Sequence, residues 1–117
     1  MTHEVLSEVR VVLTGPAPVQ AALTALGSCQ ASTYRLWAAR LGMPLESVSV
    51  TVDGDYDPRW QLGIGDSPAG LSSVWVAVAL EGLSTEEAAC LHSVVNEHSP
   101  VLDVFEHRVP VTTKWKA

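Results

Sequence analysis

The chain holds few of the residues from which metal sites, nucleic-acid surfaces and disulfide frameworks are built. Its 117 residues include two cysteines and four scattered histidines. None of these has the spacing of a zinc site, so we expect no metal and no other cofactor. Seven lysines and arginines stand against thirteen aspartates and glutamates, which gives a net charge of −6. Without a basic cluster that replaces counterions, a nucleic-acid partner is not expected.

Long uninterrupted hydrophobic runs are also missing. The most apolar stretch contains Gln20, Gln30 and Arg35, so it does not predict a membrane span. The beginning of the chain, MTHEVLSEVR, has charges where a signal peptide would be apolar. Two cysteines in such a chain are expected to be reduced thiols, and we predict a soluble cytoplasmic protein.

Apolar residues, in contrast, are abundant. They make up 47% of a chain whose length suits one domain, residues 1–117. A monomer of this size has too little interior to bury them all. We therefore expect part of the apolar surface to meet a partner subunit.

Segments with the periodicity of strands and helices predict an α+β domain. Strands are expected at residues 5–13, 45–56, 71–80 and 108–115, a long helix at 19–41, a second helix from Ser84 to about His98, and a short helical piece through Val104. The second helix opens with a capping box formed by Ser84 and Glu87. This order predicts an antiparallel sheet that backs two helices.

The long helix has predicted ends and a predicted interruption. Pro16 and Pro18 suit the approach to the helix and its first turn, where a missing N–H group is harmless. Gly42, followed by Pro44, is typical of a helix end. Gly27 indicates a kink or break in the middle.

Cys29, in the segment ALGSCQAST, is the first candidate for chemistry. A thiolate attacks electrophiles, and a helix N-terminus or a nearby cation stabilises it. If the helix breaks at Gly27, the sulfur of Cys29 meets free backbone N–H groups at the positive end of the helix dipole. If the helix runs through, Cys29 is a small buried residue, which the local pattern alone favours.

The other titratable residues are interpreted as structural. Cys90 lies on an amphipathic helix and is expected to be a small packing residue. His98, Asp103 and His107 are expected to be exposed near a helix end. The acidic run is expected to be a solvated strand edge, because it lacks the continuation of a calcium loop, and the tryptophans are expected to be core or interface anchors. These residues are Asp53, Asp55, Asp57, Trp37, Trp60, Trp75 and Trp115.

Three segments together resemble the OsmC/Ohr family, the osmotically inducible and organic hydroperoxide resistance proteins. They are TGPAPVQAALTALGSCQASTYRLWAARLGMPLESVSVTVDGDYDPR, LSSVWVAVALEG and HSPVLDVF, and the resemblance extends from about residue 14 to the C-terminus. It implies an intertwined homodimer in which antiparallel sheets from both chains wrap central helices. Relative to that family, the N-terminal strands of this chain are shortened.

The resemblance also implies an activity and its residues. In the family, one thiolate attacks the O–O bond of an organic hydroperoxide and becomes a sulfenic acid, and a second cysteine condenses with it to a disulfide. Cys29 falls on the attacking cysteine, whereas Ser99, in HSPV, stands at the position of the second. Val19 and Gln20 stand where the family carries a glutamate, and Arg10 is not equivalent by motif to the family's arginine.

Three hypotheses follow for the function. The first is a thiol peroxidase of the one-cysteine type, in which Cys29 reduces an apolar hydroperoxide and an external thiol reductant resolves the sulfenic acid. The alternative is a catalytically degenerate homodimer that binds a small apolar ligand or a partner. The third is a redox sensor in which oxidation of Cys29 changes a partner contact.

Overall fold

The elements of the protein follow one another in the order expected of an α+β domain. The structure is a computed structural model that describes residues 4–66 and 70–116. Its elements are β1 (Leu6–Val11), α1 (Ala17–Arg40), β2 (Ser47–Tyr56), α2 (Pro58–Gln61), β3 (Leu71–Glu81), α3 (Thr85–Glu97) and α4 (Pro100–Glu106). The α+β class is confirmed, and the single turn α2 is the element that the sequence did not predict.

The sheet is mixed, which differs from the antiparallel sheet expected from the sequence. Its strand order is β1-β2-β3, with β1 parallel to β2 and β2 antiparallel to β3. Helix α1 connects the first two strands as a crossover, which returns the chain to the end of the sheet where β1 began and so makes β2 parallel to β1.

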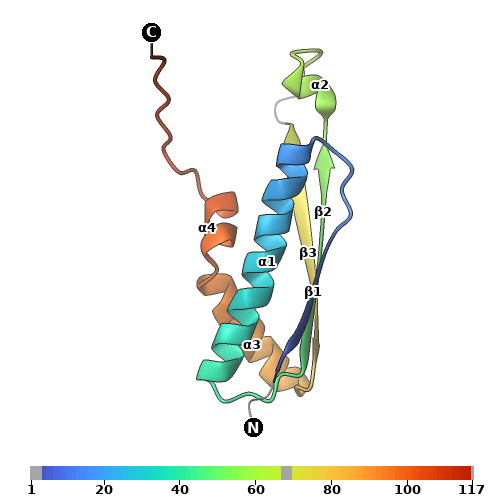
Figure 1. Ribbon diagram of the computed structural model, residues 1–117, viewed down its shortest axis with the longest axis vertical. Helices are drawn as coiled ribbons and strands as arrows, with labels where there is room; N and C mark the ends of the chain where they lie inside the picture. The colour runs from blue at the N-terminus through green and yellow to red at the C-terminus, as the bar shows by residue number, and fades with distance from the viewer. Residues whose placement is uncertain (1–3, 67–69, 117) are drawn as a thin grey trace.

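The strand expected at residues 108–115 is wrong for this single chain. Residues 108–116 form neither helix nor strand, and they lead away from α4 as an extended segment (Figure 1). A strand requires a neighbour that accepts and donates backbone hydrogen bonds, and this segment has none within the described chain.

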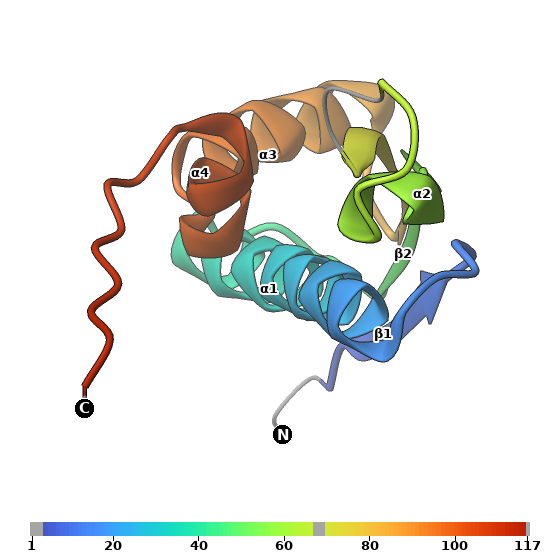
Figure 2. The same ribbon diagram turned by 90° about the horizontal axis from the view of Figure 1, so that it is seen from above.

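Helix α1 is the central element of the fold. It contacts β1 and β2 on one side and α3 and α4 on the other (Figure 2). Its apolar side chains meet those of β2 and α3 in one core, formed by Leu23, Leu26, Ala31, Tyr34, Ala38, Leu45, Val48, Val50, Val52, Leu91 and Val95. Val48, Val50 and Val52 are buried and alternate with less buried residues, as the sequence predicted, because one face of β2 lies under α1.

The interruption expected at Gly27 is also wrong, because α1 is continuous over 24 residues. Gly27 is buried against the sheet, where an added Cβ would lie 2.5 Å from Cγ1 of Val9 and 3.2 Å from Cγ2 of Val52. The glycine therefore permits close packing of α1 on β1 and β2 and does not break the helix.

The predicted end of α1 is confirmed, and its hydrogen bonds explain it. Gly42 adopts a positive φ of 67°, a conformation that glycine reaches without a Cβ penalty. The N–H of Gly42 donates to the carbonyl of Ala39 at 3.2 Å, and the N–H of Met43 donates to that of Ala38 at 2.9 Å. This pair of bonds is the Schellman motif, which satisfies the last carbonyls of a helix.

Candidate functional site

Cys29 lies in the middle of α1, about 18 Å from its N-terminus at a rise of 1.5 Å per residue. The surrounding backbone N–H groups are bonded within the continuous helix. The sulfur therefore meets neither free amides nor the positive end of the dipole. The stabilisation of the thiolate by a helix N-terminus, which the sequence would have allowed had the helix broken at Gly27, is therefore absent. The thiol itself is half-buried and is not enclosed in the core.

The nearest polar neighbour of the thiol is the hydroxyl of Ser99. The Oγ of Ser99 lies 3.5 Å from the Sγ of Cys29, and the side chain of Ser99 is buried with 3% exposure. Ser99 occupies the N-cap of α4, yet its hydroxyl does not cap that helix. An N-cap serine ordinarily accepts a bond from the first turn, so here the hydroxyl faces Cys29 in place of its usual partner.

Gln30 fixes the direction in which the Ser99 hydroxyl donates. Its Nε2 donates to the Oγ of Ser99 at 3.3 Å, and the side chain of Gln30 is buried. A hydroxyl accepts through its lone pairs and has one hydrogen to donate. When Cys29 is a thiolate, its sulfur carries no hydrogen, so Ser99 is the donor in the contact between its Oγ and the Sγ of Cys29. The result is a chain of donors that runs from Gln30 through Ser99 to the sulfur.

Thr33 is the second hydroxyl beside Cys29, one helical turn further on. Its Oγ1 donates to the backbone carbonyl of Cys29 at 2.7 Å and lies 3.9 Å from the sulfur. Because its hydrogen is already used for the carbonyl, Thr33 packs against the thiol without donating to it.

Among the described residues, no cation makes a polar contact with Cys29. In residues 4–66 and 70–116, no arginine or lysine forms a hydrogen bond with Cys29. Arg10 is exposed on β1, on the face of the sheet opposite α1, and Arg35 donates to the hydroxyl of Ser7. The polar contacts of the thiol are therefore neutral hydroxyls.

Cys90 differs from the expectation of a buried packing residue. It is exposed on α3, because α3 turns Leu91 and Val95 toward the core. The two thiols are free, and of the two it is Cys29 that lies beside the hydroxyl of Ser99.

A buried tyrosine paired with a histidine was missed in the sequence. The hydroxyl of Tyr34, which is fully buried, lies 2.6 Å from Nδ1 of His92 on α3. Burial raises the pKa of Tyr34 to about 12, so the hydroxyl stays protonated at neutral pH and shares one hydrogen bond with the ring. Asn96 contacts Nε2 of the same ring at 3.1 Å. Tyr34 and His92 are far apart in the chain, so no local pattern in the sequence indicated their contact. Only the spacing of four between His92 and Asn96 was visible.

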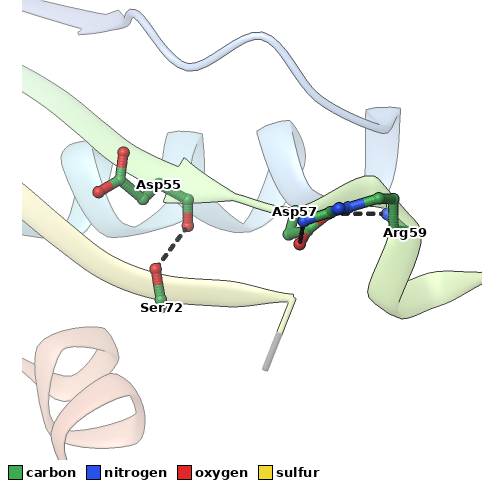
Figure 3. A network of polar contacts seen from close by, with 4 residues as sticks. All are labelled: Asp55, Asp57, Arg59 and Ser72. Carbon is green, nitrogen blue, oxygen red and sulfur yellow. Dashed lines mark hydrogen bonds and ion pairs between the residues drawn. The ribbon is translucent and has the colours of Figure 1, made fainter. Parts of the chain in front are cut away.

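The acidic run at the end of β2 serves local structure. Asp57 accepts from the backbone N–H of Arg59 at 3.0 Å as the N-cap of α2, and it forms an ion pair with the guanidinium at 2.9 Å. The carbonyl of Asp55 accepts from the hydroxyl of Ser72 at 3.4 Å (Figure 3). Asp53 and Asp55 are exposed, as predicted. Within the described ranges, no three His, Cys, Asp or Glu residues gather as metal ligands would.

The histidines near α4 lie on the surface, as predicted. His107 pairs with Asp103 at 2.9 Å, and both side chains are largely exposed. The ring of His98 packs on that of Trp37, with 4.8 Å between centroids. Neither histidine contacts Cys29. Three of the four tryptophans, at positions 60, 75 and 115, are at least half exposed, so they are not core residues.

These features define a class of protein: an α+β domain in which one half-buried thiol, on a central helix, faces a buried hydroxyl. The family model for OsmC-like proteins matches residues 13–114. The chain belongs to this family, which confirms the resemblance found in its sequence. No curated protein sequence matches the chain. Membership supports a peroxiredoxin-like or stress-related function at the level of the family. None of the described helices has the length and apolar character needed to cross a membrane.

Proposed function

We propose that the protein reduces organic hydroperoxides through Cys29 by a one-cysteine mechanism. The observation that carries the proposal is the donor chain from Gln30 through Ser99 to the sulfur, with distances of 3.3 and 3.5 Å. A hydrogen bond from a hydroxyl stabilises a thiolate more than a thiol, because bonds to a charged acceptor are the stronger ones. Ser99 thus supplies part of the stabilisation of the thiolate that a neighbouring cation supplies at other reactive cysteines.

The proposed reaction has two stages. The Cys29 thiolate attacks the terminal oxygen of the hydroperoxide, so the S–O bond forms while the O–O bond breaks, and the alkoxide leaves and takes up a proton to become an alcohol. A dithiol reductant then attacks the sulfenic acid and releases water, and its second thiol breaks the mixed disulfide to regenerate Cys29. An external reductant is needed because the hydroxyl of Ser99 forms no disulfide.

The proposal includes a homodimer, which the exposed surface supports. The chain exposes 8289 Å², against roughly 6,200 Å² for a folded monomer of its mass. Its radius of gyration is 17.0 Å, against about 13 Å for a chain of this length. The large apolar side chains left exposed include Leu36, Trp75, Val111 and Trp115. The difference in area is of the size that an obligate dimer buries for each subunit.

The test is consumption of an alkyl hydroperoxide in the presence of a dithiol. The wild-type protein is expected to consume it catalytically, and Cys29→Ser is expected to lose the activity. Cys90→Ser is the matched control and is expected to keep it, since Cys90 is exposed and lies on another helix. Equal rates for the wild-type protein and Cys29→Ser would end the proposal. A reduced thiol is required in each cycle, which agrees with the expected cytoplasmic location.

The alternative, a non-catalytic dimer that binds a small apolar ligand, is favoured by one observation. A cavity of about 490 Å³ lies at the N-terminal end of α1, lined mainly by Pro16, Pro18, Val19, Tyr56, Trp60 and Leu71. Apolar walls with few polar groups are typical of a ligand pocket. Quenching of Trp60 fluorescence by an apolar ligand, with no hydroperoxide turnover, would favour this function over the peroxidase.

A further inference from the structure

Ser99 lies in a short junction between two helices. His98 and Ser99 are the two residues that join α3 to α4. The N–H of His98 donates to the carbonyl of Val95 at 3.1 Å, and Ser99 is the N-cap of α4. These features attach the junction to its own two helices. Whether the hydroxyl of Ser99 meets Cys29 depends, in addition, on where the junction lies along α1.

The ring of His98 is oriented by a contact with its own helix. Its Nδ1 lies 2.8 Å from the carbonyl oxygen of Val94. Because a carbonyl oxygen only accepts, Nδ1 carries the hydrogen and donates it. The bond satisfies one of the carbonyls that the last turn of a helix leaves without an intrahelical partner.

His107 has the same arrangement at the end of α4 and allows a comparison. It is the C-cap of α4, and its Nδ1 lies 3.1 Å from the carbonyl oxygen of Asp103, four residues earlier. The same nitrogen also pairs with the carboxylate of Asp103, so His107 stabilises its own helix end. The contact of a histidine with the carbonyl four residues earlier is therefore a local feature that His98 and His107 share.

His98 differs from His107 because its ring also packs on another helix. The ring centroids of His98 and Trp37 lie 4.8 Å apart, with an angle of 44° between the planes. Aromatic rings at this separation attract each other. The guanidinium of Arg40 lies 5.2 Å from the centroid of the Trp37 ring, where a cation is attracted to the ring face. The Trp37 ring thus offers the junction an oriented surface on α1.

Trp37 lies on the same face of α1 as Cys29. The two residues are eight positions apart, with Thr33 midway between them, and side chains spaced by four share one face of a helix. A long side chain on a helix leans toward the N-terminus, so the ring of Trp37 leans toward the turn that carries Thr33. The junction therefore meets one face of α1 at two points, with His98 on Trp37 and Ser99 on Cys29.

We propose that His98 is a positioning residue for the reactive thiol. Its ring, packed on Trp37, sets the place of the α3–α4 junction on α1 and so holds the hydroxyl of Ser99 at the sulfur of Cys29. His98 contacts neither the sulfur nor a substrate and acts through Ser99. This inference rests on the proposed function, in which Ser99 donates to the thiolate, and it names the residue that keeps the donor in place.

The test measures alkylation of Cys29 by iodoacetamide between pH 5.5 and pH 9.5. All chains carry Cys90→Ser, so that one thiol remains. Iodoacetamide reacts with the thiolate, so the increase of the rate with pH follows the ionisation of the thiol. His98→Ala is expected to lower the rate at pH 7 at least about threefold and to displace the profile toward higher pH, because the thiolate loses the bond from Ser99.

His107→Ala is the matched control. It removes a histidine with the same contact to the carbonyl four residues earlier, at the end of the next helix. It is expected to leave the rate and the pH profile of alkylation unchanged, because His107 contacts neither Trp37 nor the junction. Equal changes in His98→Ala and His107→Ala would overturn the role of His98.

A double-mutant cycle shows whether His98 acts through Ser99. In a chain that already carries Ser99→Ala, the substitution His98→Ala is expected to cause no further change in the rate or the profile, because the hydroxyl that His98 positions is gone. A merely structural role would slow the reaction in this chain as well. Losses that multiply in the double variant would therefore overturn the proposal.

Two replacements separate the ring of His98 from its hydrogen-bond donor. His98→Phe keeps a ring that can pack on Trp37 and has no donor for Val94, and it is expected to keep at least about half of the wild-type rate. His98→Gln keeps a donor without a ring and is expected to react as slowly as His98→Ala. If His98→Ala does not fold, this pair decides in its place. Equal rates in the pair would show that the contact with Trp37 does not hold the junction.

Alkylation needs no hydroperoxide, so it separates this inference from the proposed function. The expected pattern of alkylation in a protein without peroxidase activity would support the role of His98 and overturn the peroxidase. Peroxidase activity in the wild-type protein, together with unchanged alkylation in His98→Ala, would overturn the role of His98 and leave the peroxidase standing.

Discussion

Ser99 and Cys29 are seventy residues apart in the chain, and their side chains meet at 3.5 Å. The contact exists because α4 begins beside the middle of α1, where Ser99 directs its hydroxyl away from its own helix. Gln30 donates to the same hydroxyl, so the serine is oriented by one neighbour and can donate to the other when Cys29 is a thiolate. The chemistry proposed for the thiol depends on this relationship, and the first two predictions test it.

Removing the hydroxyl is expected to slow the reaction of Cys29. A hydrogen bond to a charged group contributes about 1.5–3 kcal/mol, so Ser99→Ala is expected to lower the rate of hydroperoxide reduction by about tenfold or more. Stopped-flow measurement of single-turnover oxidation gives this rate directly. Thr33→Val is the matched control and is expected to change it less than threefold, because Thr33 donates to a carbonyl and not to the sulfur. Equal losses in the two variants would contradict the role of Ser99.

Placing a second thiol at position 99 is expected to change the product of oxidation. In Ser99→Cys, combined with Cys90→Ser, one equivalent of an alkyl hydroperoxide is expected to yield a disulfide between positions 29 and 99, because the two side chains already touch. The protein with Ser99 intact is expected to yield the sulfenic acid, trapped by dimedone. Mass spectrometry of the intact chain distinguishes the products. Dimedone labelling of both proteins to the same extent would show that the two positions do not approach closely enough.

Close packing at Gly27 predicts a large loss of stability on substitution. Gly27→Val places its Cβ 2.5 Å from Cγ1 of Val9, so α1 must move away from the sheet, which costs about 1–3 kcal/mol. Ser28→Val introduces the same β-branched side chain at the adjacent exposed position and controls for helix propensity. Urea denaturation is expected to show Gly27→Val less stable than Ser28→Val by at least about 1 kcal/mol. Equal stabilities would contradict the packing described here.

Burial of Tyr34 predicts a loss of stability at high pH. Its pKa is raised by burial to about 12 in the folded protein, against about 10 in the unfolded chain. The folded state therefore holds the proton of the Tyr34 hydroxyl more tightly than the unfolded chain does. Its contribution to the free energy of unfolding is fully present below pH 10 and is lost as the pH rises from 10 to 12. It amounts to roughly 2–3 kcal/mol.

The measurement is the urea midpoint at pH 9 and at pH 11.5. Tyr34→Phe is expected to lose less stability between these two values than the wild-type protein, because it has no buried hydroxyl to ionise. Tyr56→Phe removes a hydroxyl that donates to Gln61 near the surface, and it is expected to behave like the wild-type protein. The same dependence on pH in all three proteins would contradict the assignment to Tyr34.

Local signals in the sequence were sufficient where a structure is decided by neighbouring residues. Gly42 and Pro44 marked the end of α1, since a positive φ and a missing N–H group stop a helix by themselves. Ser84 and Glu87 formed the predicted capping box, with bonds of 3.1 and 3.0 Å. Each of these features depends on residues within one helical turn.

The errors concern features that depend on contacts between distant elements. Gly27 was interpreted as a break, yet Val9 and Val52 decide its role by packing against it. Cys90 has apolar neighbours in sequence, but the side of α3 that faces the core is set by the position of α1. The strand at residues 108–115 has the right alternation, and it lacks an edge to pair with in its own chain.

The sequence by itself determined the α+β class, the family, and Cys29 and Ser99 as the residues to examine, because composition, periodicity and motif are properties of short segments. The tertiary structure alone decided that the thiol lies in the middle of a helix, that a hydroxyl oriented by Gln30 faces it, and that residues 108–116 have no backbone hydrogen-bond partner within the described chain. These are relations between segments far apart in the chain, and they arise only when the core brings the segments together.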